Sequence, residues 1–166
     1  MGRFRWLPLF CMLLSACGWQ LQGAHRVPEA VTPLYLDLAD RHSPFAEALQ
    51  QRLRTAGVSV TRDRQQAKAI LSVSRDDNGH HVSSVSALNE PQQYEVYYNV
   101  VYRLDRQANN LLAPQTLNGS RTMTYDKLLA LAKQREEWSL RDRLAEELAD
   151  QVLRRLSMLP RTDAAN

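Results

Sequence analysis

Two stretches of the chain alternate between apolar and other side chains, as half-buried β-strands do. Residues 34–38 read Leu-Tyr-Leu-Asp-Leu, which places three leucines on one side. In residues 94–104 every second position is apolar or aromatic: Tyr94, Val96, Tyr98, Val100, Tyr102 and Leu104. Because successive strand side chains point to opposite faces, both stretches are predicted as strands with one apolar face. Tyr97 and Val101 make the other face of the longer strand partly apolar, which predicts a sheet contacted on both faces.

A hairpin is predicted between these two strands. Residues 69–74, Ala-Ile-Leu-Ser-Val-Ser, favour a strand that ends at the turn-like sequence Asp-Asp-Asn-Gly of residues 76–79. Residues 80–88 are rich in Val and Ser and are predicted as the second arm, which ends at the Asn-Glu-Pro of residues 89–91.

The remaining extended segments are shorter or more polar. Residues 58–60 are predicted as a short extended segment, and residues 105–114 as a polar loop. Residues 116–125 are predicted as a further strand, with Gly119 as a candidate β-bulge.

A helix is predicted over residues 43–56. Ser43 is a good N-cap, Pro44 suits the first helical position, and Gly57 supplies a C-terminal stop. The apolar residues at helical spacing are Phe45, Leu49, Leu53 and Ala56. A short helix or turn is predicted over residues 128–133, and a second long helix runs from Ser139 until Pro160 stops it. Its apolar stripe repeats every four residues at Leu140, Leu144, Leu148, Val152 and Leu156.

The predicted fold class is therefore α+β: a mainly antiparallel or mixed four-stranded sheet with two helices packed on one face. Residues 34–160 are expected to form one domain, and residues 161–166 a disordered tail.

The N-terminus is predicted to be a lipoprotein signal peptide over residues 1–16. Arg3 and Arg5 precede a short apolar run, and residues 14–17, Leu-Ser-Ala-Cys, resemble a bacterial lipobox. The resemblance implies an S-diacylglycerol thioether and an N-acyl chain such as palmitate on Cys17. Gly18, and not Asp, follows Cys17, so the resemblance also implies that the protein is anchored on the periplasmic side of the cell outer membrane. Three acyl chains suffice for a stable anchor, and residues 17–33 then form the acylated N-terminus and tether.

Composition argues against several kinds of chemistry. Cys11 and Cys17 are the chain's two cysteines, so the predicted domain holds no thiol for a disulfide, a metal or a nucleophile. The formal net charge is +3, and removal of Arg3 and Arg5 lowers it further, which argues against nucleic-acid binding. His80 and His81 are adjacent on a predicted strand and face opposite sides, so they do not form a metal site. We predict no catalytic residue, no metal and no cofactor apart from the lipid on Cys17.

The sequence predicts a surface for contact with a partner instead of an active site. Four tyrosines lie in or beside the central strand, and tyrosine gives large contact area at low entropic cost. Tyr94, Tyr98 and Tyr102 share the apolar face and are expected to pack in the core. Tyr97 lies on the opposite face and is the predicted partner contact.

Three segments together resemble the LPS-assembly lipoprotein LptE family: residues 17–21, Cys-Gly-Trp-Gln-Leu; residues 93–95, Gln-Tyr-Glu; and residues 128–136, which begin Leu-Leu-Ala-Leu-Ala-Lys. The resemblance implies a subunit that plugs and helps assemble LptD, an outer-membrane β-barrel, and assists delivery of lipopolysaccharide to the cell surface. It also implies that Lys133 contacts lipopolysaccharide phosphates. The family also has a basic residue in the loop before the central strand, where this chain has Leu-Asn-Glu-Pro at residues 88–91. Arg121 is the candidate substitute for that residue.

Two alternatives remain open. A generic envelope lipoprotein that binds a small ligand or scaffolds cell-wall enzymes would carry a concave apolar pocket. A lipid-anchored hydrolase would need folding to bring His80 or His42 within hydrogen-bond reach of both a serine and an aspartate.

Overall fold

The computed structural model describes residues 27–107 and 109–160. It contains the strands β1 (Leu34–Leu38), β2 (Val60–Thr61), β3 (Ala69–Val85), β4 (Pro91–Arg106) and β5 (Asn109–Thr124), and the helices α2 (Pro44–Thr55) and α3 (Ala130–Ser157). Three short 3-10 turns are η2 (Glu29–Val31), η3 (Arg64–Gln66) and η4 (Lys127–Leu129). The predictions for residues 1–16, Cys17 and residues 161–166 lie outside the described residues.

The α+β class is confirmed, but the sheet has five strands and not four. The strand order is β2-β1-β3-β4-β5, with β1 parallel to both of its neighbours and the other pairs antiparallel. The predicted strands of residues 69–74 and 80–88 form the single strand β3, and β2 is an additional strand in which Val60 and Thr61 pair with Leu34 and Tyr35. A two-residue strand is too short to show alternation, so the sequence predicted only an extended segment there.

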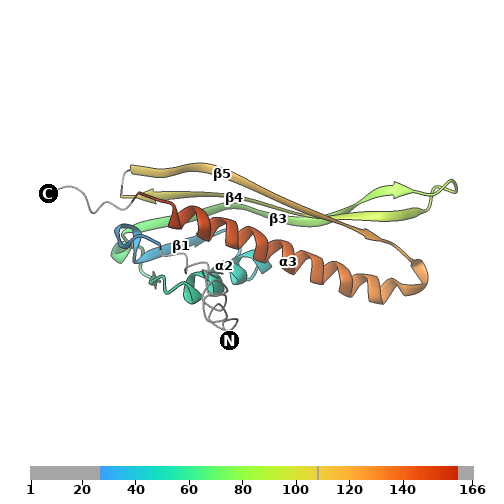
Figure 1. The fold of residues 1–166 in the computed structure, drawn as a ribbon, viewed down its shortest axis with the longest axis horizontal. Helices are drawn as coiled ribbons and strands as arrows, with labels where there is room; N and C mark the ends of the chain where they lie inside the picture. The colour runs from blue at the N-terminus through green and yellow to red at the C-terminus, as the bar shows by residue number, and fades with distance from the viewer. Residues whose placement is uncertain (1–26, 108, 161–166) are drawn as a thin grey trace, which may run out of the picture.

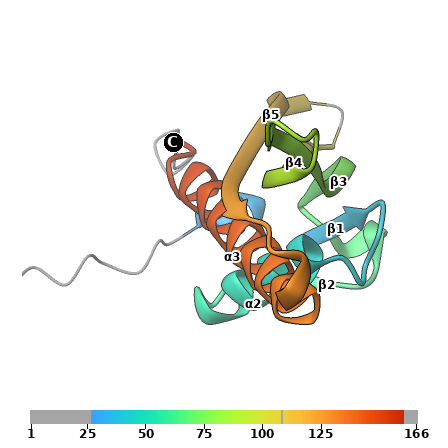
Figure 2. The ribbon, with the colours of Figure 1, turned by 90° about the vertical axis from the view of Figure 1, so that its right-hand side faces the viewer.

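Both helices lie on one face of the sheet, as Figure 2 shows. That face carries the predicted apolar side of β4, where Val96, Tyr98 and Val100 are fully buried. Helix α2 begins as predicted, because Ser43 Oγ accepts a hydrogen bond from the Ala46 N–H at 3.0 Å. Gly57 follows the helix at φ +70°, a backbone conformation that favours glycine.

The predicted turn at residues 76–79 is wrong, because β3 runs through it without a reversal. Asp76 to Gly79 pair in register with Val100 to Tyr97 of β4. The Asp76 carboxylate bonds to Ser43 and Tyr98 in place of the local backbone bonds that would make a turn. The chain instead reverses after Val85, where Ser86 N–H donates to the Glu90 carbonyl at 2.8 Å.

Two further predictions about β5 are wrong. Residues 105–114 are not a loop, since β4 and β5 are paired as far as Arg106 and Asn109. The polar side chains that suggested a loop belong to a strand at the edge of the sheet. Gly119 is not a bulge, because it pairs in regular register with Tyr98. A Cβ atom at Gly119 would lie 3.0 Å from Cδ2 of Leu144, so the glycine makes room for α3.

Helix α3 is one continuous helix of 28 residues and not a short helix followed by a long one. At ~1.5 Å per residue it is about 42 Å long, and it follows the long axis of the molecule (Figure 1). Residues 134–138 lack the apolar stripe, but glutamine, arginine and glutamate have high helix propensity and continue the helix. The end of the molecule that holds the start of α3 and the β3–β4 turn is called the distal end below.

Candidate functional site

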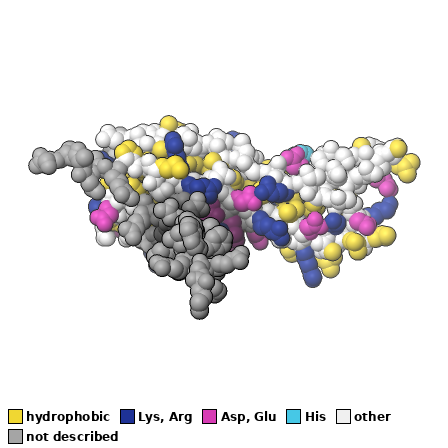
Figure 3. Space-filling model, in the orientation of Figure 1, with side chains coloured by type: hydrophobic (Ala, Val, Ile, Leu, Met, Phe, Trp, Pro, Cys, Tyr) yellow, Lys and Arg dark blue, Asp and Glu magenta, His cyan; other side chains and the backbone are white. Residues whose placement is uncertain are grey.

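Exposed apolar side chains gather at the distal end. Nine large hydrophobic side chains are exposed in the described part of the chain, and seven of them form a group here that we call the apolar rim: Val82, Val85, Leu88, Leu128, Leu129, Leu131 and Trp138. Figure 3 shows hydrophobic side chains at this end of the molecule. Large exposed apolar side chains that gather at one end of a molecule favour a surface that contacts a protein or a lipid.

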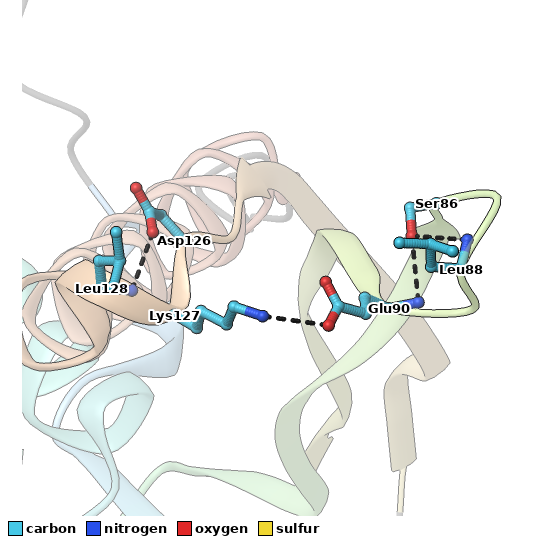
Figure 4. Close-up of polar contacts among 6 residues, drawn as sticks. All are labelled: Ser86, Leu88, Glu90, Asp126, Lys127 and Leu128. Atoms are coloured by element: carbon cyan, nitrogen blue, oxygen red, sulfur yellow. Dashed lines mark hydrogen bonds and ion pairs between the residues drawn. The ribbon is translucent and has the colours of Figure 1, made fainter.

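Local capping bonds order each side of the rim, and one ion pair connects the two sides (Figure 4). Ser86 Oγ accepts hydrogen bonds from the N–H groups of Leu88 and Glu90, each at 3.2 Å, and Asp126 accepts from the Leu128 N–H at 2.9 Å. Lys127 Nζ lies 3.0 Å from Glu90 Oε1 and joins η4 to the β3–β4 turn. Because both side chains are well exposed, this pair contributes only about 0.2–1 kcal/mol.

A cavity of about 560 Å³ lies beside the rim, between the distal half of the sheet and the start of α3. The sheet contributes His80, Tyr94 and Met123 to its walls, and Tyr125, which directly follows β5, also lines it. The helix contributes apolar and polar groups: Ala130, Leu131, Lys133, Gln134 and Glu137. The mixture of an apolar interior and a few polar groups is typical of a ligand site.

A charged cluster closes one side of this cavity. Glu137 is buried, and its Oε1 lies 2.8 Å from His80 Nδ1 and accepts a hydrogen bond from Arg141. Because a carboxylate can only accept, Nδ1 of His80 must carry the proton. The cluster therefore neutralises a buried carboxylate and ties β3 to α3.

The structure places Lys133 in the cavity and Arg121 elsewhere. Only 19% of the Lys133 side chain is exposed, and its Nζ lies 2.9 Å from Glu136 Oε2. Arg121 NH2 lies 2.7 Å from both carboxylate oxygens of Glu147. Glu136 and Glu147 are about 16 Å apart along α3 at ~1.5 Å per residue. The two predicted lipopolysaccharide contacts are therefore not brought together as one clamp.

Tyr97 lies on the face of the sheet opposite the helices and is half-buried. Its ring covers Gly79, since a Cβ atom there would lie 2.9 Å from the Tyr97 hydroxyl oxygen. The ring is thus held flat against the strand, at a place where the missing side chain of a glycine leaves room. A rigid aromatic ring on an uncovered sheet face is suited to contact a partner.

A buried polar network that the sequence did not predict fixes α2 on the sheet. The Tyr98 hydroxyl donates to Asp76 Oδ1 at 2.8 Å and accepts from the Phe45 N–H at 3.1 Å. Ser43 Oγ donates to the other carboxylate oxygen of Asp76. Burial, together with the hydrogen bond to Asp76, raises the pKa of Tyr98 well above its usual value. Tyr98 and Asp76 are 22 residues apart in the sequence, and no local pattern signalled this contact.

The polar groups do not assemble a hydrolytic site in the described residues. His80 bonds to Glu137, and the hydrogen bond from His42 to Asp40 uses the backbone N–H of His42. Neither is a Ser/His/Asp arrangement. Within residues 27–107 and 109–160 no group of three or more His, Cys, Asp or Glu side chains could hold a metal ion. None of the helices in this part of the chain has the length and apolar character needed to cross a membrane.

The sequence and the fold can be compared with known proteins. The sequence model of the LptE family, described as lipopolysaccharide-assembly, matches residues 31–156. The chain belongs to the LptE family. The family match covers every strand and both helices of the described structure except the last residue of α3.

Curated relatives agree with this assignment, and a solved structure agrees with the fold. The LPS-assembly lipoprotein LptE of Yersinia enterocolitica is 26% identical over 162 residues, which cover 96% of this chain and 77% of the relative. The LptE protein of Pectobacterium atrosepticum is 28% identical over 155 residues, covering 90% and 82%. The solution structure of lipoprotein B from Nitrosomonas europaea has a TM-score of 0.71 at 21% identity and covers 84% of this chain and 90% of that one. This structural similarity supports the α+β fold described above.

Proposed function

We propose that this LptE-family chain is a lipid-anchored outer-membrane subunit that plugs and helps assemble an LptD-like β-barrel and assists lipopolysaccharide delivery to the cell surface. The observation that carries the proposal is family membership over residues 31–156 together with the apolar rim at one end of the molecule. The names of the relatives support lipopolysaccharide assembly as the process. The chain acts by contact and not as an enzyme.

The anchor is the lipid on Cys17. Residues 1–16 are removed as a signal peptide, and Cys17 then carries the S-diacylglycerol and N-acyl chains on the periplasmic side of the outer membrane. Residues 17–33 lead from the membrane to the domain of residues 34–160. No other cofactor is required.

Lys133 is the proposed contact with lipopolysaccharide phosphates. Its ammonium group is a compact point charge with three donors, which suits a phosphate oxygen. Its support is position, because Lys133 lines the distal cavity beside the apolar rim. Arg121 is the weaker candidate, since its guanidinium already pairs with both oxygens of Glu147.

Tyr97 is the proposed contact with the barrel. Because strand side chains alternate, Tyr97 lies on the sheet face opposite that of the buried Tyr98. Neither α2 nor α3 covers that face (Figure 2), so Tyr97 can meet another protein surface. The matched variants are Tyr97→Ala, which removes the ring, and Tyr97→Phe, which keeps it and removes the hydroxyl.

The test is co-purification of the tagged, lipidated protein from outer membranes extracted with mild detergent. We expect a barrel of the LptD family to be recovered in a stoichiometric amount and identified by mass spectrometry. Tyr97→Ala should reduce this recovery, and Tyr97→Phe should retain most of it. Recovery of the lipidated chain alone, with the barrel left in the unbound fraction, would overturn the proposal.

A second candidate function is an envelope lipoprotein that binds a small ligand or scaffolds cell-wall enzymes. The observation in its favour is the concave distal cavity, which this alternative requires. The same purification separates the two, since this alternative predicts cell-wall enzymes, or no protein, in place of a barrel.

A further inference from the structure

Strand β5 is a long free edge of the sheet. It pairs with β4 on one side, and no strand of the described residues pairs with it on the other. Figure 1 shows β5 as the outermost strand. Its register with β4 is unbroken from Gln115 to Thr124, a stretch of about 33 Å at ~3.3 Å per residue. A regular edge of this length is a template for a further strand.

One hydrogen bond shows which backbone groups of β5 face the free edge. The Tyr125 N–H donates to the Gln92 carbonyl of β4 at 2.8 Å. Because antiparallel pairs alternate between bonded and non-bonded residues, the odd-numbered residues before Tyr125 also bond to β4 as far as Gln115. The even-numbered residues direct their N–H and C=O groups away from β4. The four edge residues of this kind are Thr116, Asn118, Ser120 and Thr122.

The two edges of the sheet are protected unequally. The opposite edge, β2, is two residues long, and a very short edge strand resists pairing with another chain. At one end of β5, Pro114 has no N–H, and its carbonyl accepts a hydrogen bond from Gln115 Nε2 at 3.3 Å. After Gln115 the one charged side chain of β5 is Arg121, which bonds to Glu147 and to the Ser120 carbonyl. Since a carbonyl can accept two hydrogen bonds, the edge after Gln115 remains open to pairing.

The side chains along this edge favour an uncharged segment. On the outer face, the side chains of the four edge residues are polar and exposed. On the helix face, Leu117 packs against the core and is only partly buried, so an apolar neighbour would complete its burial. The charge of Arg121 is balanced by Glu147, so a charged segment would lose hydration without gaining a counter-ion. The complementary segment therefore alternates apolar residues with small polar residues such as threonine.

We infer that β5 binds an extended, uncharged segment of the barrel partner by strand addition, with backbone hydrogen bonds to the four edge residues. Since a closed barrel leaves no strand edge unpaired, this segment belongs to a loop or a terminal extension of the barrel protein. The edge is continuous with the proposed contact at Tyr97, because Ser120 pairs directly with Tyr97. This inference rests on the proposed function for the identity of the partner, and it adds the element and the kind of bond.

The test compares proline variants at neighbouring positions of β5, with the lipidated full chain in the co-purification experiment. Asn118→Pro removes an N–H that points away from β4, so the β4–β5 pairing is kept and the variant should fold. Its ring obstructs an added strand, and recovery of the barrel should fall about tenfold. Leu117→Pro removes an N–H that bonds to β4, and its much lower melting temperature should verify the orientation of the strand. Unchanged recovery with a folded Asn118→Pro variant would overturn the inference.

A second pair of variants keeps the test decisive if Asn118→Pro does not fold. Asn118→Lys leaves the backbone unchanged and places a lysine on the free edge, where lysine protects natural sheets against pairing. Val60→Lys is the matched control, because Val60 is exposed on the opposite edge strand. Recovery of the barrel should fall several-fold with Asn118→Lys and stay at the parent level with Val60→Lys. Equal recovery with both variants, or equal loss, would contradict strand addition at β5.

Amide hydrogen exchange separates backbone pairing from side-chain contact. The amide protons of Asn118 and Ser120 should exchange quickly in the free chain and about tenfold or more slowly in the barrel complex, because an added strand accepts their hydrogen bonds. Exchange is measured by mass spectrometry with fragmentation that resolves single residues. A contact made through side chains alone would leave these two rates unchanged, and that result would overturn strand addition.

The two proposals fail in different ways. If the parent chain recovers no barrel, the proposed function is overturned. If the parent recovers the barrel and neither Asn118 variant reduces the recovery, strand addition alone is overturned. A second copy of this chain as the occupant is tested with two differently tagged copies expressed together. Co-purification of the two copies that Asn118→Pro abolishes would overturn the barrel segment as the occupant of this edge.

Discussion

Glu137 shows how a single residue connects the candidate site to the stability of the fold. Its carboxylate is buried and is bonded by one side chain from β3 and one from its own helix. A buried carboxylate of this kind is stable only while its partners remain. The site and the packing of α3 on the sheet therefore depend on the same three side chains.

Replacing Glu137 by alanine should destabilise the protein by about 2–3 kcal/mol, because it leaves the largely buried Arg141 guanidinium without its carboxylate. This loss of stability is smaller than that expected for a fully buried ion pair, because part of the Arg141 side chain is exposed to water. The measurement is urea-induced unfolding at neutral pH. The matched control is Glu136→Gln, an exposed neighbour whose loss should cost no more than about 0.5 kcal/mol. Similar midpoints for both variants would show that the Glu137 cluster does not stabilise the fold.

Tyr98 makes stability sensitive to alkaline pH. Burial and the bond to Asp76 raise the folded-state pKa of Tyr98 above its ordinary value of about 10. Folding therefore favours the neutral phenol, and this stabilisation is fully present below about pH 10 and is lost as the pH rises beyond it. Tyr102, whose pKa is also raised by burial, contributes in the same direction.

The Tyr98→Phe variant should be less stable than the parent by about 1–3 kcal/mol near pH 8, because the Phe45 N–H and Asp76 each lose a buried partner. Its stability should then fall less steeply than that of the parent between about pH 10 and pH 12. Unfolding free energies from urea titrations at several pH values test both points. Tyr97→Phe, on the outer face, should keep the steep decline, and an equally steep decline in Tyr98→Phe would refute the assignment.

At the scale of elements, the close contact between β5 and α3 decides how the long helix lies on the sheet. Gly119 faces α3, and the Leu144 side chain occupies the space that a side chain at this position would need. The arrangement explains why a glycine, which weakens a strand on its own, is found in the middle of β5. The absence of a Cβ atom at this position lets the Leu144 side chain of α3 pack closely against β5.

Gly119→Val should destabilise the fold by about 1–3 kcal/mol, since the new side chain overlaps Leu144 in a packed core. Thermal unfolding followed by circular dichroism measures the loss. Ser120→Val is the matched control, because Ser120 is exposed on the other face of the same strand and valine is a good strand former. A melting temperature for Gly119→Val at or above that of the control would contradict the packing argument.

At the scale of the whole molecule, the helices divide the surface into unlike parts. Helices α2 and α3 cover one face of the sheet (Figures 1 and 2). The opposite face carries Tyr97, and the distal end carries the apolar rim and the cavity. The molecule therefore has two exposed surfaces that are separate from the covered face of the sheet. The co-purification experiment with the Tyr97 variants addresses the uncovered sheet face.

Hydrophobic periodicity by itself determined much of this protein. Strand β1, helix α2 with its Ser43 cap, the buried side of β4 and the apolar stripe of α3 all follow from local spacing and capping preferences. These features depend on residues a few positions apart, so a single sequence contains the information. The segment around Lys133 also suggested a family that the comparison confirmed.

Only the tertiary structure decided the course of β3, the pairing of β2 and the composition of the distal cavity. Asp76 to Gly79 resemble a turn, but Ser43 and Tyr98 satisfy Asp76 from across the fold and keep the strand extended. His80 and Glu137 are 57 residues apart, and no local pattern predicts their contact. Local propensity identifies elements, whereas buried polar partners and cavities arise where distant segments meet, because burial makes each unsatisfied group costly.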